Sequence, residues 1–240
     1  MVFHEVAPRS PEWAALRLGI PCSSEFHRII TPKKREISKQ ADGLMFRLLA
    51  EWVTGAPVEN AETEWMVRGT EMEDAAIRAY EGLMDVETSV GGFCTTDDGM
   101  VGCSPDRLVG DDGDLEIKCP LIQTQIGYAL TGTVDEDYKS QLQGRLWITG
   151  RKWVDIFSYH PALLIPPVRV VRDEQYIKEL EAVLKAFVAQ MLDRRVILEQ
   201  RFGPFVRPVV EVPIEYPEWL TAEDGERIIE SQRAALKVQA

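Results

Sequence analysis

The most constraining feature of the sequence is residues 98–120, DGMVGCSPDRLVGDDGDLEIKCP. Apolar stretches flank a turn at 110–113, where Gly and Asp tolerate the positive φ that tight turns need. The segment therefore predicts a β-hairpin. In its second strand, the period of two places Glu116 and Lys118 on one face. The hairpin turns that face towards Asp106, so two carboxylates and an ammonium group converge at one end of a sheet.

This trio of side chains suits hydrolysis of a phosphate ester. Two carboxylates can hold a hard cation such as Mg²⁺, which prefers oxygen ligands. The cation polarises a phosphoryl oxygen and lowers the pKa of bound water. A neighbouring lysine can orient or deprotonate that water. An exposed acidic hairpin with a chance salt bridge is the alternative that the trio alone leaves open.

The segment also resembles a known signature. Ser104-Pro105-Asp106, nine intervening residues and then Glu116-Ile117-Lys118-Cys119-Pro120 are similar to the PD-(D/E)xK nuclease motif. The resemblance is to the phage lambda exonuclease type of alkaline exonuclease, within the YqaJ-like viral recombinase family. It implies an α/β fold with a restriction-endonuclease-like core, in which helices flank a central mixed sheet. The order of expected strands and helices agrees with that fold.

The resemblance implies a role for each residue of the hairpin motif. Asp106, Glu116 and the Ile117 carbonyl would bind Mg²⁺, for which Mn²⁺ can substitute. Lys118 would position the attacking water. These roles depend on the resemblance and are expectations about the site.

A helix expected over residues 61–81 supplies a further acid. Its pattern Gly69-x-x-x-Glu73-x-x-Ala76 resembles the family helix that brings another carboxylate to the metal site. This alignment nominates Glu73 as both a catalytic and a metal-binding residue. Glu71 stays open as the alternative, if the register differs by two.

The N-terminal segment resembles the family's phosphate-binding motif. Ser10-Pro11-Glu12 predicts the start of a helix. The pattern Trp13-x-x-x-Arg17-x-Gly19-Ile20-x-x-x-Ser24 follows, and in the family its Arg and Ser receive a terminal 5′-phosphate. A guanidinium group can fork onto phosphate oxygens. Ser23 or Ser24 would cap a second short helix, and a serine at a helix N-terminus adds a hydroxyl where backbone N–H groups already favour anions. A surface arginine and an ordinary N-cap are the other interpretation.

A helix expected over residues 136–149 carries a glutamine motif. Its segment YKSQLQG resembles the family motif whose first glutamine lies near the metal and the phosphate backbone. That position is Gln141. Gln143 and Arg145 are weaker candidates in the same motif.

The charge of the chain is unevenly distributed. The net charge is −12, and residues 61–120 alone carry 4 basic and 15 acidic side chains. Almost all the excess acid therefore lies in the quarter that would build the metal site. Such a charge argues against nonspecific coating of nucleic acid. It is compatible with a nuclease that grips DNA in one locally basic channel.

Several classes of protein are disfavoured. No apolar run approaches the ~20 residues that span a bilayer, and no secretory signal is visible, so we expect a cytoplasmic location. The four cysteines form no CxxC pair, which disfavours zinc and iron–sulfur sites, and a disulfide framework is not expected without secretion. We expect an exonuclease domain over 1–203, followed by a proline-rich crossing segment and C-terminal helix over 204–240.

The resemblance implies a metal-dependent 5′-to-3′ exonuclease on double-stranded DNA. It would release 5′-mononucleotides and leave a 3′ single-stranded overhang for recombination. A homotrimer ring, a single-strand annealing partner and a phage or prophage origin in a bacterial host are implied in the same way. A PD-(D/E)xK endonuclease and a non-catalytic module that binds DNA ends are the alternatives.

Overall fold

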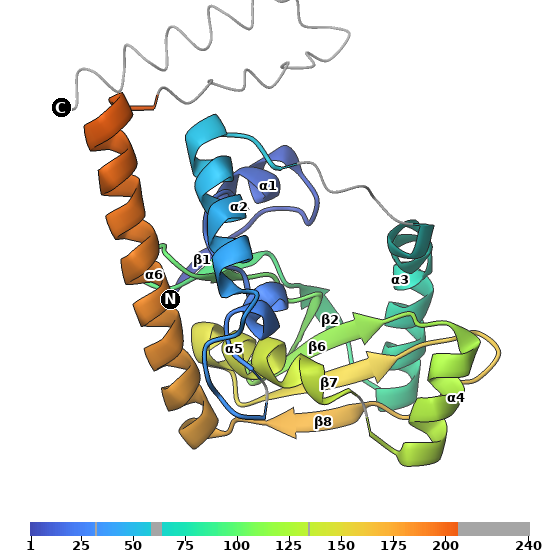
Figure 1. Ribbon diagram of the computed structural model, residues 1–240. Helices are drawn as coiled ribbons and strands as arrows, with labels where there is room; N and C mark the ends of the chain where they lie inside the picture. The colour runs from blue at the N-terminus through green and yellow to red at the C-terminus, as the bar shows by residue number, and fades with distance from the viewer. Residues whose placement is uncertain (32, 59–63, 134, 206–240) are drawn as a thin grey trace, which may run out of the picture. The chain divides into compact units, whose positions relative to one another are not determined.

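The computed structural model describes residues 1–31, 33–58, 64–133 and 135–205, with only the backbone of 64–70. Figure 1 draws the other residues as a thin grey trace. The boundary expected at residue 203 falls just after the last described helix, α6 (Glu174–Phe202). The C-terminal appendage expected over 204–240 lies outside the described residues from 206 onward, so it stays a prediction.

The central sheet is mixed, as the predicted fold class requires. Its strand order is β2-β5-β6-β7-β8, with bounds β2 (Thr88–Val90), β5 (Arg107–Val109), β6 (Gly113–Lys118), β7 (Trp153–Ser158) and β8 (Val168–Val171). Strands β6 and β7 pair in parallel, whereas β2–β5, β5–β6 and β7–β8 are antiparallel. A smaller antiparallel sheet has the order β1-β3-β4, with β1 (Val2–His4), β3 (Phe93–Thr95) and β4 (Gly102–Cys103).

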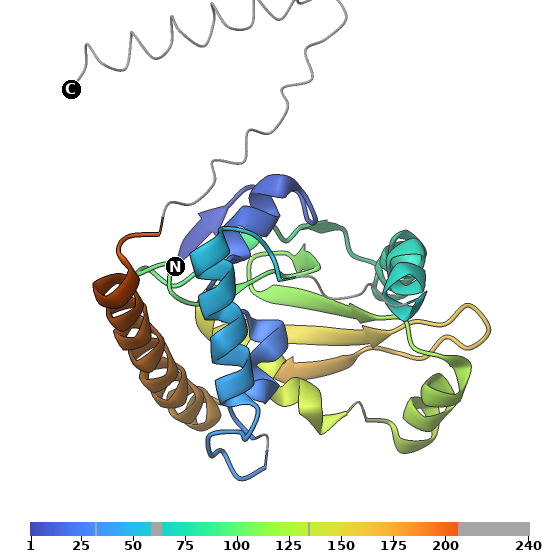
Figure 2. The same cartoon turned by 45° about the horizontal axis from the view of Figure 1, so that its top comes forward.

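Helices surround the central sheet. Besides α6 they are α1 (Pro11–Arg17), the 3₁₀ helix η1 (Ser23–Arg28), α2 (Ala41–Thr54), α3 (Glu64–Met84), α4 (Ile122–Thr131), the 3₁₀ helix η2 (Glu136–Tyr138) and α5 (Lys139–Thr149). Figures 1 and 2 show α3 and α4 at the end of the sheet to which β6 and β7 point, and α6 along the opposite side. Of the described helices, none combines the length and apolar character needed to cross a membrane.

Both faces of the sheet are covered by apolar packing. On one face, Tyr80 of α3 lies in a buried cluster with Leu115 and Phe157. On the other face, Leu146 of α5 packs in a cluster with Val154. Because side chains alternate along a strand, the residues of β6 next to Leu115 must face α5. The sheet therefore directs its acidic positions, Asp114 and Glu116, under α5.

A third layer brings the N-terminal part of the chain against α5. The largest cluster of buried residues includes Phe26 of η1, Leu44 of α2 and Leu180 of α6. Gly144 makes the close approach of η1 possible, because a Cβ at that position would lie 2.4 Å from two ring atoms of Phe26. The contact between η1 and α5 sets how far the N-terminal segment lies from the end of the sheet.

Gly144→Ala should therefore destabilise the protein. A methyl group at this position overpacks the contact with the fully buried Phe26, and such overpacking typically costs ~1–3 kcal/mol. Gly43→Ala in α2 is the matched control, since nothing lies within 4 Å of the added Cβ. It should stabilise by roughly 0.5–1 kcal/mol through helix propensity. Urea unfolding of the two variants measures both effects, and a stabilised Gly144→Ala variant would contradict the packing argument.

Candidate active site

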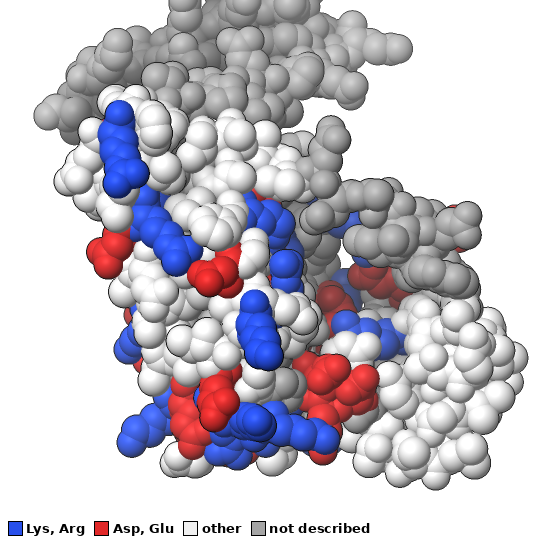
Figure 3. Space-filling model, viewed as in Figure 1, with Lys and Arg blue, Asp and Glu red and all other residues white. Residues whose placement is uncertain are grey.

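The side chains that the sequence nominates line one pocket. This pocket has a volume of about 230 Å³, and its lining includes Arg17, Ser24, Glu73, Asp106, Glu116, Lys118 and Gln141. Figure 3 shows acidic and basic side chains together in the hollow between the α1 side and the α3 side of the molecule. The tertiary structure thus gathers residues from five separate parts of the chain. Their individual roles stay predictions.

The hairpin has the predicted geometry. Strands β5 and β6 pair in the register Arg107↔Leu115, which places Asp106 beside Glu116. The Asp106 Oδ2 accepts a hydrogen bond of 2.7 Å from the Ile117 backbone N–H, so its carboxylate is fixed against the strand. The Lys118 Nζ lies 2.5 Å from Glu116 Oε1. The two acids and the lysine therefore meet at the carboxyl end of β6.

Helix α5 supplies further donors to the same carboxylate. The Gln141 Nε2 donates to Glu116 Oε1 at 2.8 Å. One turn later Arg145, which is completely buried, donates to Glu116 Oε2 and to both carboxylate oxygens of Asp114. Sequence reasoning nominated Gln141 for this region. It held Arg145 only as a weaker candidate and did not consider Asp114 at all.

Burial changes the protonation behaviour of this cluster. Burial raises the pKa of Asp114 to about 6, although the adjacent Arg145 opposes the shift. Burial acts to lower the pKa of Arg145. The nearby carboxylates of Asp114 and Asp106 act to raise it by more, so the net shift of the pKa is upward. The guanidinium group therefore stays charged inside the protein.

Helix α3 presents Glu73, and not Glu71, to the pocket. Glu73 lines the pocket and its Oε2 accepts a hydrogen bond of 2.7 Å from Arg9 Nη2. Glu71 is exposed and lies outside the lining. The register that the sequence left open thus places Glu73 at the site. Sequence reasoning missed Arg9, which adopts a positive φ of 66° in a segment without periodic pattern.

Helix α1 is tied to the Ser104–Asp106 turn. The Trp13 Nε1–H donates to Ser104 Oγ at 3.0 Å, and Ser104 Oγ donates to the Gly92 carbonyl at 2.8 Å. The Arg17 guanidinium lies over the Trp13 ring, 4.1 Å from its centroid. Arg17 and Asp106 therefore line the same pocket.

The expected serine cap of the second helix is wrong. That element is the 3₁₀ helix η1, which starts at Ser23, and its N-cap is Cys22 with no side-chain hydrogen bond. The reason is that both serines already lie inside the helix, so their hydroxyls are not at the capping position. Ser24 is exposed, Ser23 is buried, and both line the pocket. Sequence reasoning did not nominate Ser23 for the pocket.

The donor set fits a hard cation. Asp106 and Glu116 offer carboxylate oxygens at one end of the pocket, and Mg²⁺ is usually bound by one or two carboxylates with waters and substrate phosphates. Within the described part of the chain, no three His, Cys, Asp or Glu side chains are grouped closely enough to hold a metal alone. The protein would therefore supply part of the coordination sphere, and water and substrate the rest.

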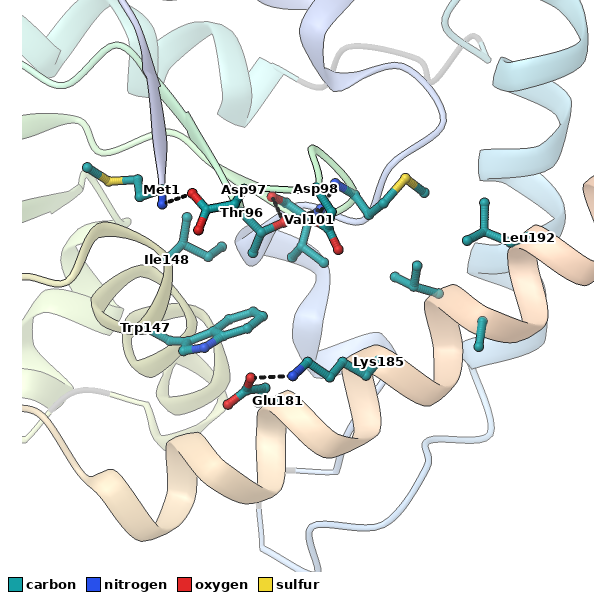
Figure 4. Close-up of a pocket in the computed structure, with 13 residues that line it drawn as sticks. Met1, Thr96, Asp97, Asp98, Val101, Trp147, Ile148, Glu181, Lys185 and Leu192 are labelled. Carbon is teal, nitrogen blue, oxygen red and sulfur yellow. Dashed lines mark hydrogen bonds and ion pairs between the residues drawn. The ribbon is translucent and has the colours of Figure 1, made fainter.

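A larger pocket, of about 610 Å³, lies elsewhere, and its lining includes Asp97, Asp98, Glu181 and Lys185 (Figure 4). Trp147 and Ile148 of α5 form its apolar wall. On α6, Lys185 is paired with Glu181 at 2.7 Å. None of the residues nominated for catalysis lines this pocket.

Comparison with known proteins identifies close relatives of this fold. A model of the YqaJ-like viral recombinase domain matches residues 12–152. The crystal structure of an alkaline exonuclease, LHK-Exo from Laribacter hongkongensis, has 32% sequence identity and a TM-score of 0.73, covering 80% of this chain and 97% of that chain. LHK-Exo in complex with dAMP gives the same TM-score and coverage at 30% identity.

A phage related exonuclease from Haemophilus somnus 129PT shares the fold, with 14% identity and a TM-score of 0.53, covering 73% of this chain and 96% of that chain. No curated protein sequence matches the chain significantly.

The two acids of α3 give a direct test of the pocket. Glu73→Gln should weaken Mn²⁺ binding by roughly tenfold or more, because even partners outside the metal's direct ligands typically change affinity by 10–100-fold. Glu71→Gln removes the same charge two residues away, outside the pocket, and should bind Mn²⁺ like the unmodified protein. Isothermal titration in the absence of DNA measures both. Equal affinity in the two variants would count against Glu73.

Proposed function

Because this chain belongs to the YqaJ-like viral recombinase family, we propose that it is a metal-dependent 5′-to-3′ exonuclease on double-stranded DNA. Family membership and the similarity to an alkaline exonuclease make it a nuclease hydrolase of the exonuclease class that acts on DNA. The proposal adds the direction of digestion, the release of 5′-mononucleotides and a 3′ single-stranded overhang. The observation that carries it is a single pocket that combines carboxylates and a lysine with an arginine and a serine.

The carboxylate end of the pocket would hold the cation. Asp106, Glu116 and the Ile117 carbonyl would bind Mg²⁺, and Glu73 would contribute to a second site; Mn²⁺ can substitute. When bound, the cation supplies a Lewis acid that polarises the phosphoryl group and lowers the pKa of water. The hydrogen bond from the Ile117 N–H holds Asp106 in place for this role.

Lys118 and Gln141 would organise the reacting groups. Lys118 lies between the Glu116 carboxylate and the Tyr138 ring, 4.8 Å from the ring centroid, so its ammonium group is confined at the end of β6. From this position it can orient the attacking water and steady charge that develops on the phosphate. Gln141 reaches the same place from α5 and can hold the phosphate backbone of the scissile strand.

The arginine end of the pocket would receive the terminal phosphate. Arg17 is held over Trp13, and a guanidinium group binds phosphate oxygens through two parallel hydrogen bonds. Ser24 adds a hydroxyl on the same wall. A phosphate held there would give digestion its 5′-to-3′ direction, because the end of the strand is fixed before the bond is cut.

The proposal extends to the setting in which the enzyme acts. The overhang would be taken up by a single-strand annealing protein during recombination in the cytoplasm of a bacterium that carries the phage or prophage. A homotrimer ring around the duplex would keep the enzyme on its DNA. Sedimentation of the purified protein tests the trimer, and a monomer at working concentration would reject it.

The first experiment is digestion of linear duplex DNA labelled at one 5′ end. Mg²⁺-dependent release of labelled mononucleotide, suppressed by chelator and absent on closed circular DNA, is the expected result. Internal fragments or cleavage of the circle would indicate a PD-(D/E)xK endonuclease. Binding to the end without release would indicate a non-catalytic module.

Glu116→Ala and Lys118→Ala should each lower the rate of digestion by about 10³-fold, since each removes several kcal/mol of transition-state stabilisation. Asp112→Ala is the matched control in the same hairpin, because this exposed acid pairs only with the exposed Lys152 in the contacts described. It should digest DNA at the unmodified rate. Full activity in either pocket variant, with unfolding temperature unchanged, would remove that residue from the mechanism.

Arg17→Ala should reduce the preference for 5′-phosphorylated ends by roughly 10–100-fold, which corresponds to loss of a charged hydrogen bond. The measurement is the ratio of digestion rates on duplexes with and without the terminal phosphate. Arg78→Ala, at an exposed position of α3, is the control and should keep the ratio. If Arg17→Ala slows both substrates equally, the phosphate pocket is assigned wrongly.

A further inference from the structure

Arg145 is the largest completely buried side chain in the described part of the protein. Its Nε donates to Asp114 Oδ2 at 3.0 Å, and its Nη2 donates to the Leu115 carbonyl at 3.0 Å. Shorter contacts join Nη2 to Asp114 Oδ1 and Nη1 to Glu116 Oε2. A guanidinium group has donors in a rigid planar fork and no acceptor, so it can serve both carboxylates at once.

Arg145 offsets the cost of burying two acidic side chains of β6 close together. Asp114 and Glu116 are two residues apart on one face of the strand and are only 0% and 3% exposed. Two carboxylates buried side by side repel each other and lose their hydration. Arg145 between them leaves one net negative charge, which is carried towards the pocket by Glu116.

Glu116 is consequently held from two sides. Its Oε2 faces the interior and meets Arg145, whereas its Oε1 faces the pocket and meets Lys118 and Gln141. Asp114 is absent from the lining of the pocket, so it is positioned to act on Arg145 and not on a ligand.

We propose that Arg145, anchored by Asp114, is a positioning residue that fixes the Glu116 carboxylate so that Oε1 alone is presented to a divalent cation. This inference rests on the proposed function and adds two residues to it. Arg145 removes rotational freedom from Glu116, and Asp114 balances the charge of Arg145 so that the cation is not repelled. Packing alone would require neither the fork between two acids nor the charge balance.

The decisive variant is the double substitution Asp114→Asn with Arg145→Gln. It removes one negative and one positive charge, so the net charge is unchanged and only the restraint on Glu116 is lost. The expected result is Mn²⁺ binding weakened by about tenfold or more, as for other outer partners of metal ligands. Calorimetric titration of Mn²⁺ without DNA gives the affinity, and digestion at saturating Mn²⁺ gives kcat separately.

The sheet offers a matched control on its other face. Asp155 on β7 is 1% exposed and forms a bidentate pair with Arg169 on β8, with both hydrogen bonds at 2.8 Å. Asp155→Asn with Arg169→Gln makes the same charge change in the same sheet, away from Glu116. This control should alter stability while leaving Mn²⁺ affinity and kcat as they are in the unmodified protein.

Arg145→Lys gives a second arm that keeps the charge. A single ammonium group cannot fork onto both acids, so Mn²⁺ affinity should again fall. Asp114→Asn alone leaves the charge of Arg145 uncompensated beside Glu116 and should weaken Mn²⁺ binding through repulsion. These single variants decide the question if the double variant does not fold.

The outcomes distinguish failure of the positioning role from failure of the proposed function. The positioning role would be overturned if the folded variants of Asp114 and Arg145 had the same Mn²⁺ affinity and kcat as the unmodified protein. It would also be overturned if the Asp155 and Arg169 control lost as much Mn²⁺ affinity as they do. Both results presuppose that the unmodified protein binds Mn²⁺ and digests DNA with it. If the unmodified protein does neither, the proposed function fails first and the positioning role fails with it.

Discussion

Burial of acidic side chains under α5 is the constraint on which the site depends. Strand β6 alternates apolar and acidic positions, and helix α5 covers the face on which the acids lie. Buried carboxylates are costly unless hydrogen-bonded or paired. Helix α5 meets that requirement with Gln141 and Arg145, which lie one turn apart on the face towards β6. The polarity of this helix is therefore a consequence of the strand that it covers.

The second constraint is close contact between the N-terminal segment and the sheet. Gly144 lets η1 approach α5 through Phe26, and the hydrogen bond from Trp13 to Ser104 ties α1 to the Ser104–Asp106 turn. Together these contacts bring Arg17 into the pocket that holds Asp106. The arginine and the carboxylates can line one pocket because both contacts are made. This is how the fold supports the family's exonuclease chemistry.

The structure also shows where the excess acidic side chains lie. The acidic quarter of the chain, residues 61–120, includes acids that pair inside the protein, such as Asp114, and acids that face the pocket, such as Glu73. Others are exposed, such as Asp112. A net charge of −12 is thus compatible with a DNA enzyme, because part of the negative charge is paired inside the protein or faces the pocket.

Patterns of short range determined much of this protein by themselves. The strand period places Glu116 and Lys118 on one face, the Gly and Asp turn closes the hairpin, and Ser10 caps α1 as predicted. These features depend on neighbours a few residues apart, so the sequence contains them directly. The mixed sheet with flanking helices followed from the order of such elements together with the family resemblance.

Only the tertiary structure decided which distant side chains meet. It placed Glu73, and not Glu71, in the lining of the pocket, brought Arg9 into contact with that acid, and joined Arg145 to Asp114 across 31 positions of sequence. No periodic signal marks such pairs, since each depends on how a helix lies over a strand. The expected serine cap of η1 was wrong, since this 3₁₀ helix starts at Ser23 and its N-cap is Cys22. The sequence therefore predicted the local parts of the site, and non-local packing brought them together.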